Sequence, residues 1–404
     1  MARATSLARA VKAAMPPASR AEWLPFHRPS LDARDVKGVV ETLESGWLTT
    51  GPVTRRFEQK FARAVGARDA LALSSGTAAL HLALRVLGVQ PGDDVIVPTY
   101  TFTATAEVVT YLGARPVLAD VDPVTGNLRA EDVAAVLTPK TRAVVPVHLA
   151  GLPCEMAPIR ELAEGADMRI LEDAAHAFPA SEGKRPVGTL GDAAAFSFYA
   201  TKNITTGEGG MLVLQDPAAA EQARILALHG ISRDAWLRYT ASGSWRYQIL
   251  ASGYKYNLTD IASSLGLSQL AKARAFHARR RLLAARYGRA LRRLDAIETP
   301  PTRAGTEHAW HLYVIRVLPE VLRIDRDAVI EELRARNIGT SVHFIPLHLH
   351  PYYQQVWGYR PGAFPHAEAL FEQAISLPLY PAMSVGDVDD VVAALTDIVK
   401  RHRR

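Results

Sequence analysis

The chain has 404 residues, of which 48% are apolar and 22% are charged, and its formal net charge is +6. These proportions are typical of a soluble globular protein, and the length allows one large α/β domain plus a smaller one. The single cysteine, Cys154, excludes a disulfide framework and a metal site built from several cysteines. No apolar run approaches the roughly 18 residues of a membrane span. We therefore expect a cytoplasmic protein with no membrane partner and no metal.

The segment up to about residue 275 alternates short apolar runs with longer amphipathic stretches. Before it, residues 1–20 are basic without a continuous apolar core, which predicts a tail and not a signal peptide. The runs that predict strands are residues 70–73, 94–98, 115–121, 142–149, 168–175, 193–199 and 211–215. The stretches that predict helices are 31–45, 77–88, 103–112, 155–165 and 217–229. The alternation predicts an α/β fold, with a large domain over 21–275 built on a mostly parallel sheet.

The pattern changes near residue 260, where a long helical stretch over 260–293 begins. A proline-rich break at 298–305 ends it. The segments after the break predict strands at 310–318 and 339–345, and helices at 325–336, 366–375 and 386–401. We expect residues 276–404 to form a bridging helix and a small C-terminal α/β domain.

The long helical stretch contains a strongly basic run over residues 277–293. One interpretation is a nucleic-acid patch. The other is a solvated helix face, because Leu282, Leu283, Tyr287 and Leu291 recur at helical spacing and leave the arginines mostly on the other side. The second is favoured, so we expect no nucleic-acid partner. A modest positive field would also suit an anionic substrate such as a sugar nucleotide.

Two loops that follow predicted strands contain groups suited to an anion and to a planar ring. Ligands of an open α/β sheet bind outside the carboxyl ends of its strands. The segment SSGTAAL (74–80) opens a helix whose N–H groups, with Gly76, could bind an anion, although a plain N-cap is an equal alternative. The segment PTYTFTA (98–104) contains Phe102, which could lie against a planar ring or in the core.

Two further loops contain ionisable groups. In EDAAHA (172–177), a buried Asp173 would need a cation such as a pyridinium nitrogen, although in isolation a helix cap and a core histidine are the favoured interpretation of this segment. In FSFYATKN (196–203), Lys202 follows an apolar run and precedes the turn TTGEGG. A desolvated lysine is a nucleophile toward carbonyl groups. Most lysines are simply exposed, but the apolar run and the glycine turn argue against that alternative.

With SGWLTTGP (45–52) and GYKYNLTDI (253–261), these four segments occur in an order and spacing that resemble the DegT/DnrJ/EryC1/StrS family of sugar aminotransferases. The resemblance runs from about Leu24 to the C-terminus. It implies a fold-type-I aminotransferase with pyridoxal 5'-phosphate (PLP) as cofactor, and a homodimer with shared active sites.

The resemblance also implies roles for single residues. Lys202 matches the Schiff-base lysine, Asp173 the carboxylate at the pyridine nitrogen, His176 the residue near the ring hydroxyl and Phe102 the aromatic that stacks on the ring. The residues that match phosphate contacts are Gly76, Thr77, Ser197 and, acting from the other subunit, Asn257.

Within the family, TSVHFIPLH (340–348) resembles members that aminate C4 of a nucleotide-linked 4-keto sugar, as in UDP-4-amino-arabinose synthesis. His343 and His348 in this segment have equally good interpretations as core or surface residues. The implied partners are a nucleotide-linked keto sugar and an amino-acid donor, glutamate, with an amino sugar for cell-surface polysaccharide as product. The alternatives are a PLP-dependent sugar dehydratase or lyase, and a non-catalytic regulator. Dehydratase members carry histidine in place of the lysine, so Lys202 favours aminotransfer.

Overall fold

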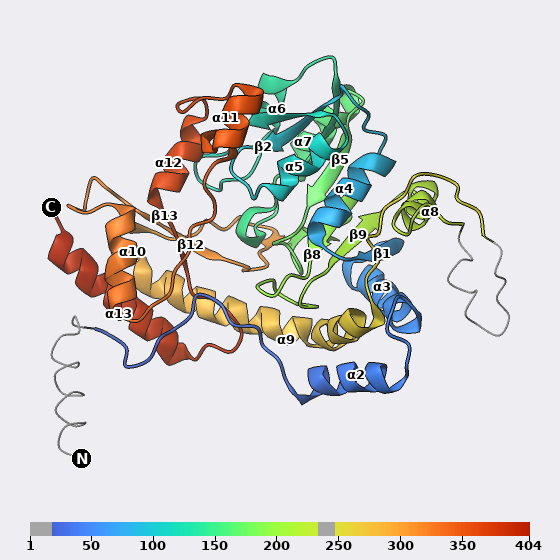
Figure 1. Ribbon diagram of the computed structural model, residues 1–404. Coiled ribbons are helices and arrows are strands. Elements are labelled where there is room, and N and C mark those ends of the chain that lie inside the picture. Colours follow the sequence, from blue (N-terminus) through green and yellow to red (C-terminus); the bar gives the residue numbers. More distant parts are fainter. Residues whose placement is uncertain (1–17, 233–246) are drawn as a thin grey trace.

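The computed structural model describes residues 18–232 and 247–404, and its centre is a seven-stranded sheet (Figure 1). The order of the strands is β1-β9-β8-β5-β4-β2-β3. Their bounds are β1 Asp69–Leu73, β2 Asp94–Pro98, β3 Arg115–Ala119, β4 Thr141–Val144, β5 Arg169–Asp173, β8 Ala193–Ser197 and β9 Gly210–Leu214. Only β9 runs antiparallel to its neighbours. The mostly parallel sheet predicted from the sequence is therefore confirmed, and its strands lie close to the predicted positions.

Helices cover both faces of this sheet. Its strands are apolar at consecutive positions, because side chains on both faces are buried. One face packs against α4 (Gly76–Val86), α5 (Ala104–Tyr111) and α8 (Pro217–Leu226). The other face packs against α3 (Pro52–Val65), α6 (Ala130–Val136) and α7 (Met156–Gly165). Helices α3 and α6 were not predicted, although Pro52 at the first position of α3 is a typical helix start.

A second sheet, of order β10-β12-β13, forms beside the C-terminal half of α9 (Asp260–Leu291). Its strands are β10 Ile297–Glu298, β12 Tyr313–Val317 and β13 Ala374–Leu377, and α10 (Arg326–Ala335) and α13 (Val385–His402) share its core. In Figure 1, α2 (Ala33–Glu44) lies along the other end of α9. The intervening η3 (Leu347–Leu349), α11 (Pro351–Trp357) and α12 (Pro365–Gln373) pack against the large sheet. A third, small sheet joins β11 (Thr306–Glu307), β6 (Ser181–Glu182) and β7 (Arg185–Pro186).

The strand predicted over residues 339–345 is wrong. This segment forms no strand, and only Ser341 makes a single bridge, to Ser376. The segment meets the free edge of β13 at this one bridge and then leaves the sheet, so no further pairing forms. Strand β13 lies partly where the sequence predicted the end of a helix, because its fully buried residues fit a sheet core as well as a helix face.

The basic run in α9 is only partly the solvated face that its spacing predicted. Arg280 is 1% exposed, and its Nη1 donates hydrogen bonds to the carbonyl oxygens of Trp310, His311 and Leu379. Burial lowers the pKa of this guanidinium to about 9. Arg280 therefore ties α9 to the loop before β12 and to the segment after β13. Most of the predicted tail, residues 1–17, is not among the described residues. Its last residue, Arg20, forms an ion pair with Asp387.

A buried carboxylate joins the start of α9 to the start of α3. Asp260 is 1% exposed, and its oxygens accept hydrogen bonds from the N–H groups of Gly51 (2.7 Å), Val53 (3.0 Å) and Thr54 (2.9 Å) and from the Thr54 hydroxyl (2.6 Å). Because the first N–H groups of α3 have no acceptor within their own helix, this carboxylate caps α3 from a residue two hundred positions away.

We expect Asp260→Ala to lower the free energy of unfolding by about 3 kcal/mol, since four buried donors lose their acceptor. Thermal and urea unfolding of the two proteins measure this difference. Glu44→Ala, which removes an exposed carboxylate at the end of α2, is the control and should change stability by less than about 0.5 kcal/mol. Equal effects of the two substitutions would contradict the role given to Asp260.

Candidate active site

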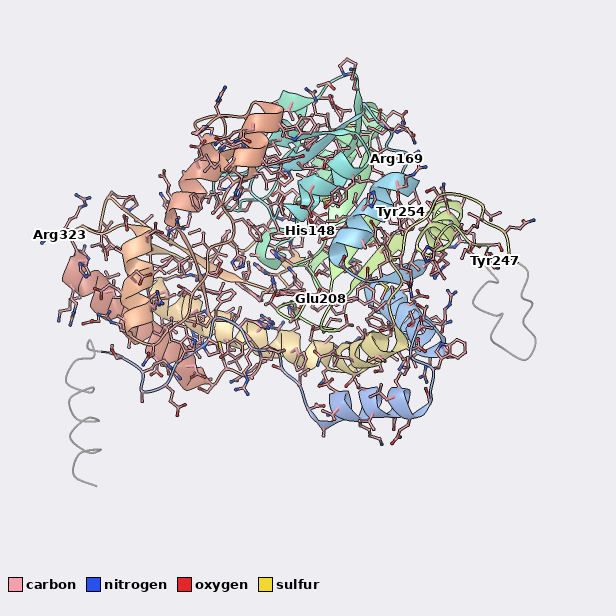
Figure 2. The ribbon with its side chains drawn as sticks, viewed as in Figure 1. His148, Arg169, Glu208, Tyr247, Tyr254 and Arg323 are labelled. Carbon is pink, nitrogen blue, oxygen red and sulfur yellow. The ribbon has the colours of Figure 1, made fainter. Side chains whose placement is uncertain are left out.

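A cavity of about 420 Å³ lies at the carboxyl ends of the parallel strands. The loops after β1, β2, β5 and β8 all contribute to its lining, as the position of ligands in open α/β sheets predicts. The predicted site residues that line it are Gly76, Thr77, Phe102, Asp173, His176, Ser197 and Lys202. Glu208, from the glycine turn that follows Lys202, also lines the cavity and lies between the central sheet and α9 (Figure 2).

Lys202 supplies the amine of this cavity. It follows β8, and its backbone N–H donates to the carbonyl oxygen of Tyr199 at 2.9 Å. Desolvation lowers the pKa of its side chain to about 8, while the nearby Asp173 carboxylate acts in the opposite direction. A much larger fraction of this amine is therefore uncharged near neutral pH than of a lysine in water, as a nucleophilic amine requires.

Asp173 supplies the carboxylate, at the end of β5, where it is 5% exposed. Its oxygens accept hydrogen bonds from the Thr105 hydroxyl (2.8 Å) and the Ala175 N–H (3.1 Å), and the Thr101 and Thr105 hydroxyls lie 2.9 Å apart. Burial raises the pKa of this carboxyl, and the hydrogen bond from Thr105 opposes the rise. The two threonines were not predicted; Thr101 lies in the loop after β2, and Thr105 lies in the first turn of α5.

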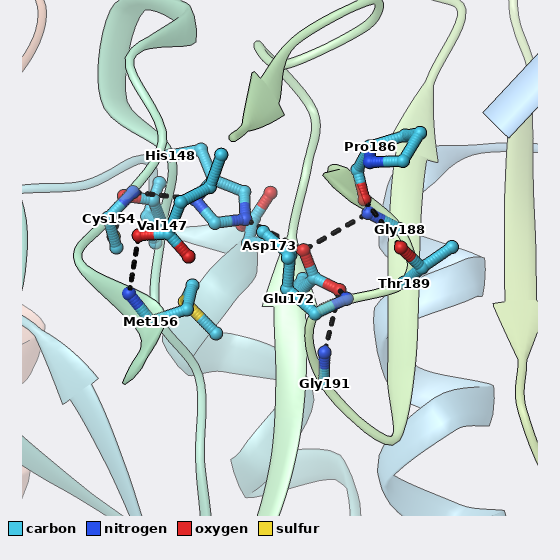
Figure 3. Close-up of polar contacts among 12 residues, drawn as sticks. Val147, His148, Cys154, Met156, Glu172, Asp173, Pro186, Gly188, Thr189 and Gly191 are labelled. Atoms are coloured by element: carbon cyan, nitrogen blue, oxygen red, sulfur yellow. Dashed lines mark hydrogen bonds and ion pairs between the residues drawn. The ribbon is translucent and has the colours of Figure 1, made fainter. Parts of the chain in front are cut away.

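The neighbouring Glu172 points to the other side of β5, where it is completely buried (Figure 3). Its carboxylate accepts hydrogen bonds from the N–H groups of Gly188, Leu190 and Gly191 and from His148 Nε2 (3.0 Å). His148 Nδ1 in turn accepts from the N–H of Cys154, so the ring proton lies on Nε2. The backbone N–H of His148 donates to the backbone carbonyl oxygen of Asp173. This network fixes the backbone from which Asp173 projects.

Aromatic and imidazole rings form one wall of the cavity. His176 Nδ1 accepts a hydrogen bond from the Ala150 N–H at 3.3 Å, so Nε2 carries the proton. Phe344 stacks on His176 with ring centres 5.9 Å apart, and it lies equally far from Phe102. Burial lowers the pKa of His343 to about 4, and the positive charge of Lys202 acts in the same direction. His311, which the sequence analysis did not select, also lines the cavity.

The N-terminus of α4 provides an anion-binding surface. Ser75 caps the helix by accepting from the N–H of Ala78, which leaves the N–H groups of Gly76 and Thr77 without an acceptor inside the helix. A Cβ atom on Gly76 would lie 3.0 Å from the Cβ of Ser197, so a larger residue would push the helix and β8 slightly apart. The first turn of α4 and the Ser197 hydroxyl can therefore face a phosphate together.

Two residues singled out in the sequence lie outside the cavity. Asn257 is not part of the lining. Its side-chain NH2 donates to the Thr50 hydroxyl at 2.7 Å, and its side-chain oxygen accepts from the Lys255 ammonium group. His348 is in the core, hydrogen-bonded to Thr99 Oγ1 and to Glu368. His343, by contrast, lines the cavity, so the two histidines of one motif have different roles.

The cavity has four features that match PLP group by group. It offers a helix N-terminus for the phosphate, a buried carboxylate for the ring nitrogen, a desolvated amine for the aldehyde and an aromatic side chain for the ring face. A sheet of this topology with these groups at its carboxyl edge defines a PLP-dependent enzyme.

The chain belongs to the DegT/DnrJ/EryC1/StrS aminotransferase family, whose model matches residues 29–396. It is 47% identical to the spore coat polysaccharide biosynthesis protein SpsC of Bacillus subtilis, over 94% of this chain and 98% of SpsC. It is also 47% identical to the uncharacterized protein MJ1066 of Methanocaldococcus jannaschii, over 95% of this chain and 100% of that protein.

Solved structures lead to the same class. The PLP form of the sugar aminotransferase Spr1654 from Streptococcus pneumoniae superimposes with a TM-score of 0.87 at 33% identity, over 94% of this chain and 99% of Spr1654. The protein is therefore a PLP-dependent sugar aminotransferase, as predicted. Within residues 18–232 and 247–404, no helix is long and apolar enough to cross a bilayer. The same residues contain no cluster of side chains arranged to hold a metal ion.

We expect the cofactor-free protein to capture PLP at a rate that rises with pH through a midpoint near pH 8, because only the uncharged Lys202 amine attacks the aldehyde. Stopped-flow absorbance measures this rate. In Asp173→Asn the midpoint should move to lower pH, because the carboxylate that raises the lysine pKa is gone. A midpoint near 10.5, the ordinary value for lysine, would show that Lys202 is not desolvated.

Proposed function

We propose that this enzyme transfers the amino group of glutamate to C4 of a nucleotide-linked 4-keto sugar. The observation that carries the proposal is the position of His343 on the cavity wall beside the amine of Lys202. The segment around His343 resembles that of C4 aminotransferases, and in this position its ring can contact a sugar. The name of SpsC supports a role in polysaccharide synthesis, and a nucleotide sugar of that kind would be met in the cytoplasm.

In this proposal each predicted residue acts on one part of the bound molecules. Gly76, Thr77 and Ser197 would bind the cofactor phosphate, and Phe102 would cover the ring. His176 would donate from Nε2 to the ring hydroxyl. These contacts would hold the cofactor in one orientation, within reach of the Lys202 amine.

Asp173 and Lys202 carry the chemistry. Bound PLP supplies an electron-accepting ring that stabilises negative charge on the substrate carbon. Asp173 keeps a proton on the ring nitrogen, because a buried carboxylate is most stable beside a cationic partner. The free amine of Lys202 removes the proton from the donor carbon and returns it one position away, as general base and then general acid.

The competing reactions are elimination by a PLP-dependent sugar dehydratase or lyase, and no reaction at all. The lysine at position 202 favours amination, because dehydratase members carry histidine there. A regulator without activity would not need a desolvated amine facing a buried carboxylate. Consumption of an amino donor in equal amount to the product distinguishes amination from elimination.

We propose further that two copies form a homodimer with shared active sites. Asn257 lies outside the cavity of its own chain, where its side chain is hydrogen-bonded to Thr50, and in the proposed dimer it serves the cavity of the partner. Helix α2 exposes an apolar stripe, in which Val36 is 62%, Val40 43% and Leu43 50% exposed. Apolar residues at this spacing on an exposed helix are typical of a surface that a partner covers.

We expect the PLP form, incubated with glutamate and a panel of nucleotide-linked 3-keto and 4-keto sugars, to yield one amino sugar from a 4-keto substrate. Mass spectrometry identifies the product, and NMR identifies the aminated carbon. Lys202→Ala is the control and should give no product. Amination at C3 would contradict the assignment of the carbon, and a dehydrated product without loss of glutamate would favour the lyase.

A mixed dimer tests whether Asn257 acts across the interface. We expect Lys202→Ala and Asn257→Asp homodimers to be nearly inactive, since the second variant places a negative charge against the phosphate. If Asn257 acts in the partner's site, the mixed dimer has one intact site and should recover up to about half of the normal activity. Doubly tagged dimers purified after co-expression are assayed for turnover.

The inverse pairing is the matched control. A chain with both substitutions, paired with an unmodified chain, should be nearly inactive, because each of its two sites then contains one lesion. Half of the normal activity in this control, with none in the first pairing, would show that Asn257 acts within its own chain.

A further inference from the structure

A small chamber of about 20 Å³ adjoins the active-site cavity. Its polar lining consists of His27, Thr201, His311 and His343, and the last three of these also line the main cavity. The rest of its lining is Phe26, Leu312, Leu377 and Leu379. A site for one water requires roughly 10–15 Å³ and two to four polar partners. The chamber therefore has room for a water molecule, and it is too small for a sugar or an amino acid.

Asn203 determines which nitrogen of His311 faces a ligand. The side-chain NH2 of Asn203 donates to the carbonyl oxygens of Phe178 (2.7 Å) and Ala309 (3.0 Å), so its orientation is fixed and its oxygen meets His311 Nδ1 at 3.2 Å. His311 must then carry its proton on Nδ1, and Nε2 is left with a lone pair. No hydrogen bond to Nε2 exists in the described part of the chain. Burial and the charge of Lys202 keep the pKa of this ring far below its ordinary value, so the ring stays neutral.

His27 offers a second acceptor by the same argument. Its Nε2 lies 3.2 Å from the carbonyl oxygen of Ala200, which can only accept, so the proton of the neutral ring lies on Nε2 and Nδ1 has a lone pair. Burial lowers the pKa of His27 to about 4. The Thr201 hydroxyl can supply a donor to the same small space. Two acceptors and one donor match the two hydrogens and the lone pairs of one water.

We propose that the chamber binds one ordered water molecule and that His311 is the residue that positions it. The water donates to His311 Nε2 and to His27 Nδ1, and it accepts from the Thr201 hydroxyl. The positive charge of Lys202 acts on His27, His311 and His343, three of the residues that line the chamber, so the water is held at the amine end of the active site. Asn203 does not contact the water; it holds His311 in the tautomer whose Nε2 can accept a hydrogen bond from the water.

This position gives the water a use in the reaction. Starting with the cofactor joined to Lys202, the donor half-reaction takes up one amino acid and one water. It yields one keto acid, the free Lys202 amine and the aminated cofactor, so the oxygen of the water ends in the keto acid. A water held beside Lys202 is available for this step without entry from solvent. The rate test below also rests on the proposed glutamate donor.

A crystal structure of the PLP form, at a resolution that shows ordered water, tests the site directly. We expect one water within hydrogen-bonding distance of His311 Nε2 and His27 Nδ1. A dry chamber in the unmodified enzyme would overturn the proposal, whatever the substrate proves to be. This result does not depend on glutamate, so it separates failure of the water site from failure of the proposed donor.

Two isosteric variants test the function of His311. In H311N the amide NH2 stands in for Nδ1–H and keeps the bond to Asn203, but no acceptor reaches the chamber. In H311Q the amide oxygen reaches the place of Nε2 and can accept. We expect the glutamate half-reaction, followed by cofactor absorbance in single-turnover experiments, to be about tenfold slower in H311N, with most of the rate restored in H311Q.

The comparison of the two variants excludes a merely structural role. If His311 only packs against His176, whose ring lies 4.4 Å away, both variants should be slowed alike, and that result would overturn the proposal. An unchanged glutamate half-reaction in H311N, with a slower sugar half-reaction, would show that His311 meets a sugar hydroxyl instead. Thr201→Val, which removes the donor from the chamber, should also slow the glutamate half-reaction and provides a variant outside the histidine cluster.

Discussion

The carboxylate of Glu172 holds the edge of the sheet at which the active site forms. A fully buried charge is tolerated only when its oxygens are satisfied, and this carboxylate has three backbone N–H groups and His148 as donors. The donors come from two loops that flank β5, so the bond network fixes both loops against the strand. Asp173 is the next residue along the chain, and alternation along the strand points it to the opposite face. One buried ionic cluster thus sets the position of the Asp173 carboxylate in the cavity.

The chemistry of the cavity depends on the desolvation that this framework maintains. The same burial raises the pKa of Asp173 and lowers that of Lys202, while the attraction between their charges opposes both shifts. The imidazoles near Lys202 are kept neutral by burial and by its positive charge. Each neutral ring has one donor and one acceptor nitrogen, and a backbone or amide group selects which of them faces the ligand. The wall of the site is therefore a defined pattern of donors and acceptors without net charge.

The sequence predicted local features well where pattern and tertiary environment agree. The strands of the large sheet are apolar runs of the right length, and burial on both faces is what produces such runs. Helix α3 was missed although Pro52 and the spacing of Phe57, Phe61 and Val65 are local helix signals, whereas its cap by Asp260, distant in sequence, could not be predicted. Residues 339–345 have a strand-like pattern but do not form a strand. Ser341 bridges to Ser376 on the free edge of β13, whereas the consecutive residues His343 and Phe344 both line the cavity, so the segment loses the alternation of a strand.

The sequence by itself determined the fold class and the family, and it selected Lys202 and Asp173, both of which line the cavity. The local sequence is enough to select these two residues, because Asp173 ends a predicted strand and Lys202 lies in the loop just after another. Only the tertiary structure decided which groups share the cavity: it brought in His311 and Thr105 and left out His348 and the chain's own Asn257. It also decided protonation and tautomer, because these depend on partners far apart in sequence, such as Asn203 for His311. A side chain's identity is local, whereas its desolvation and its hydrogen-bond partners are properties of the folded chain.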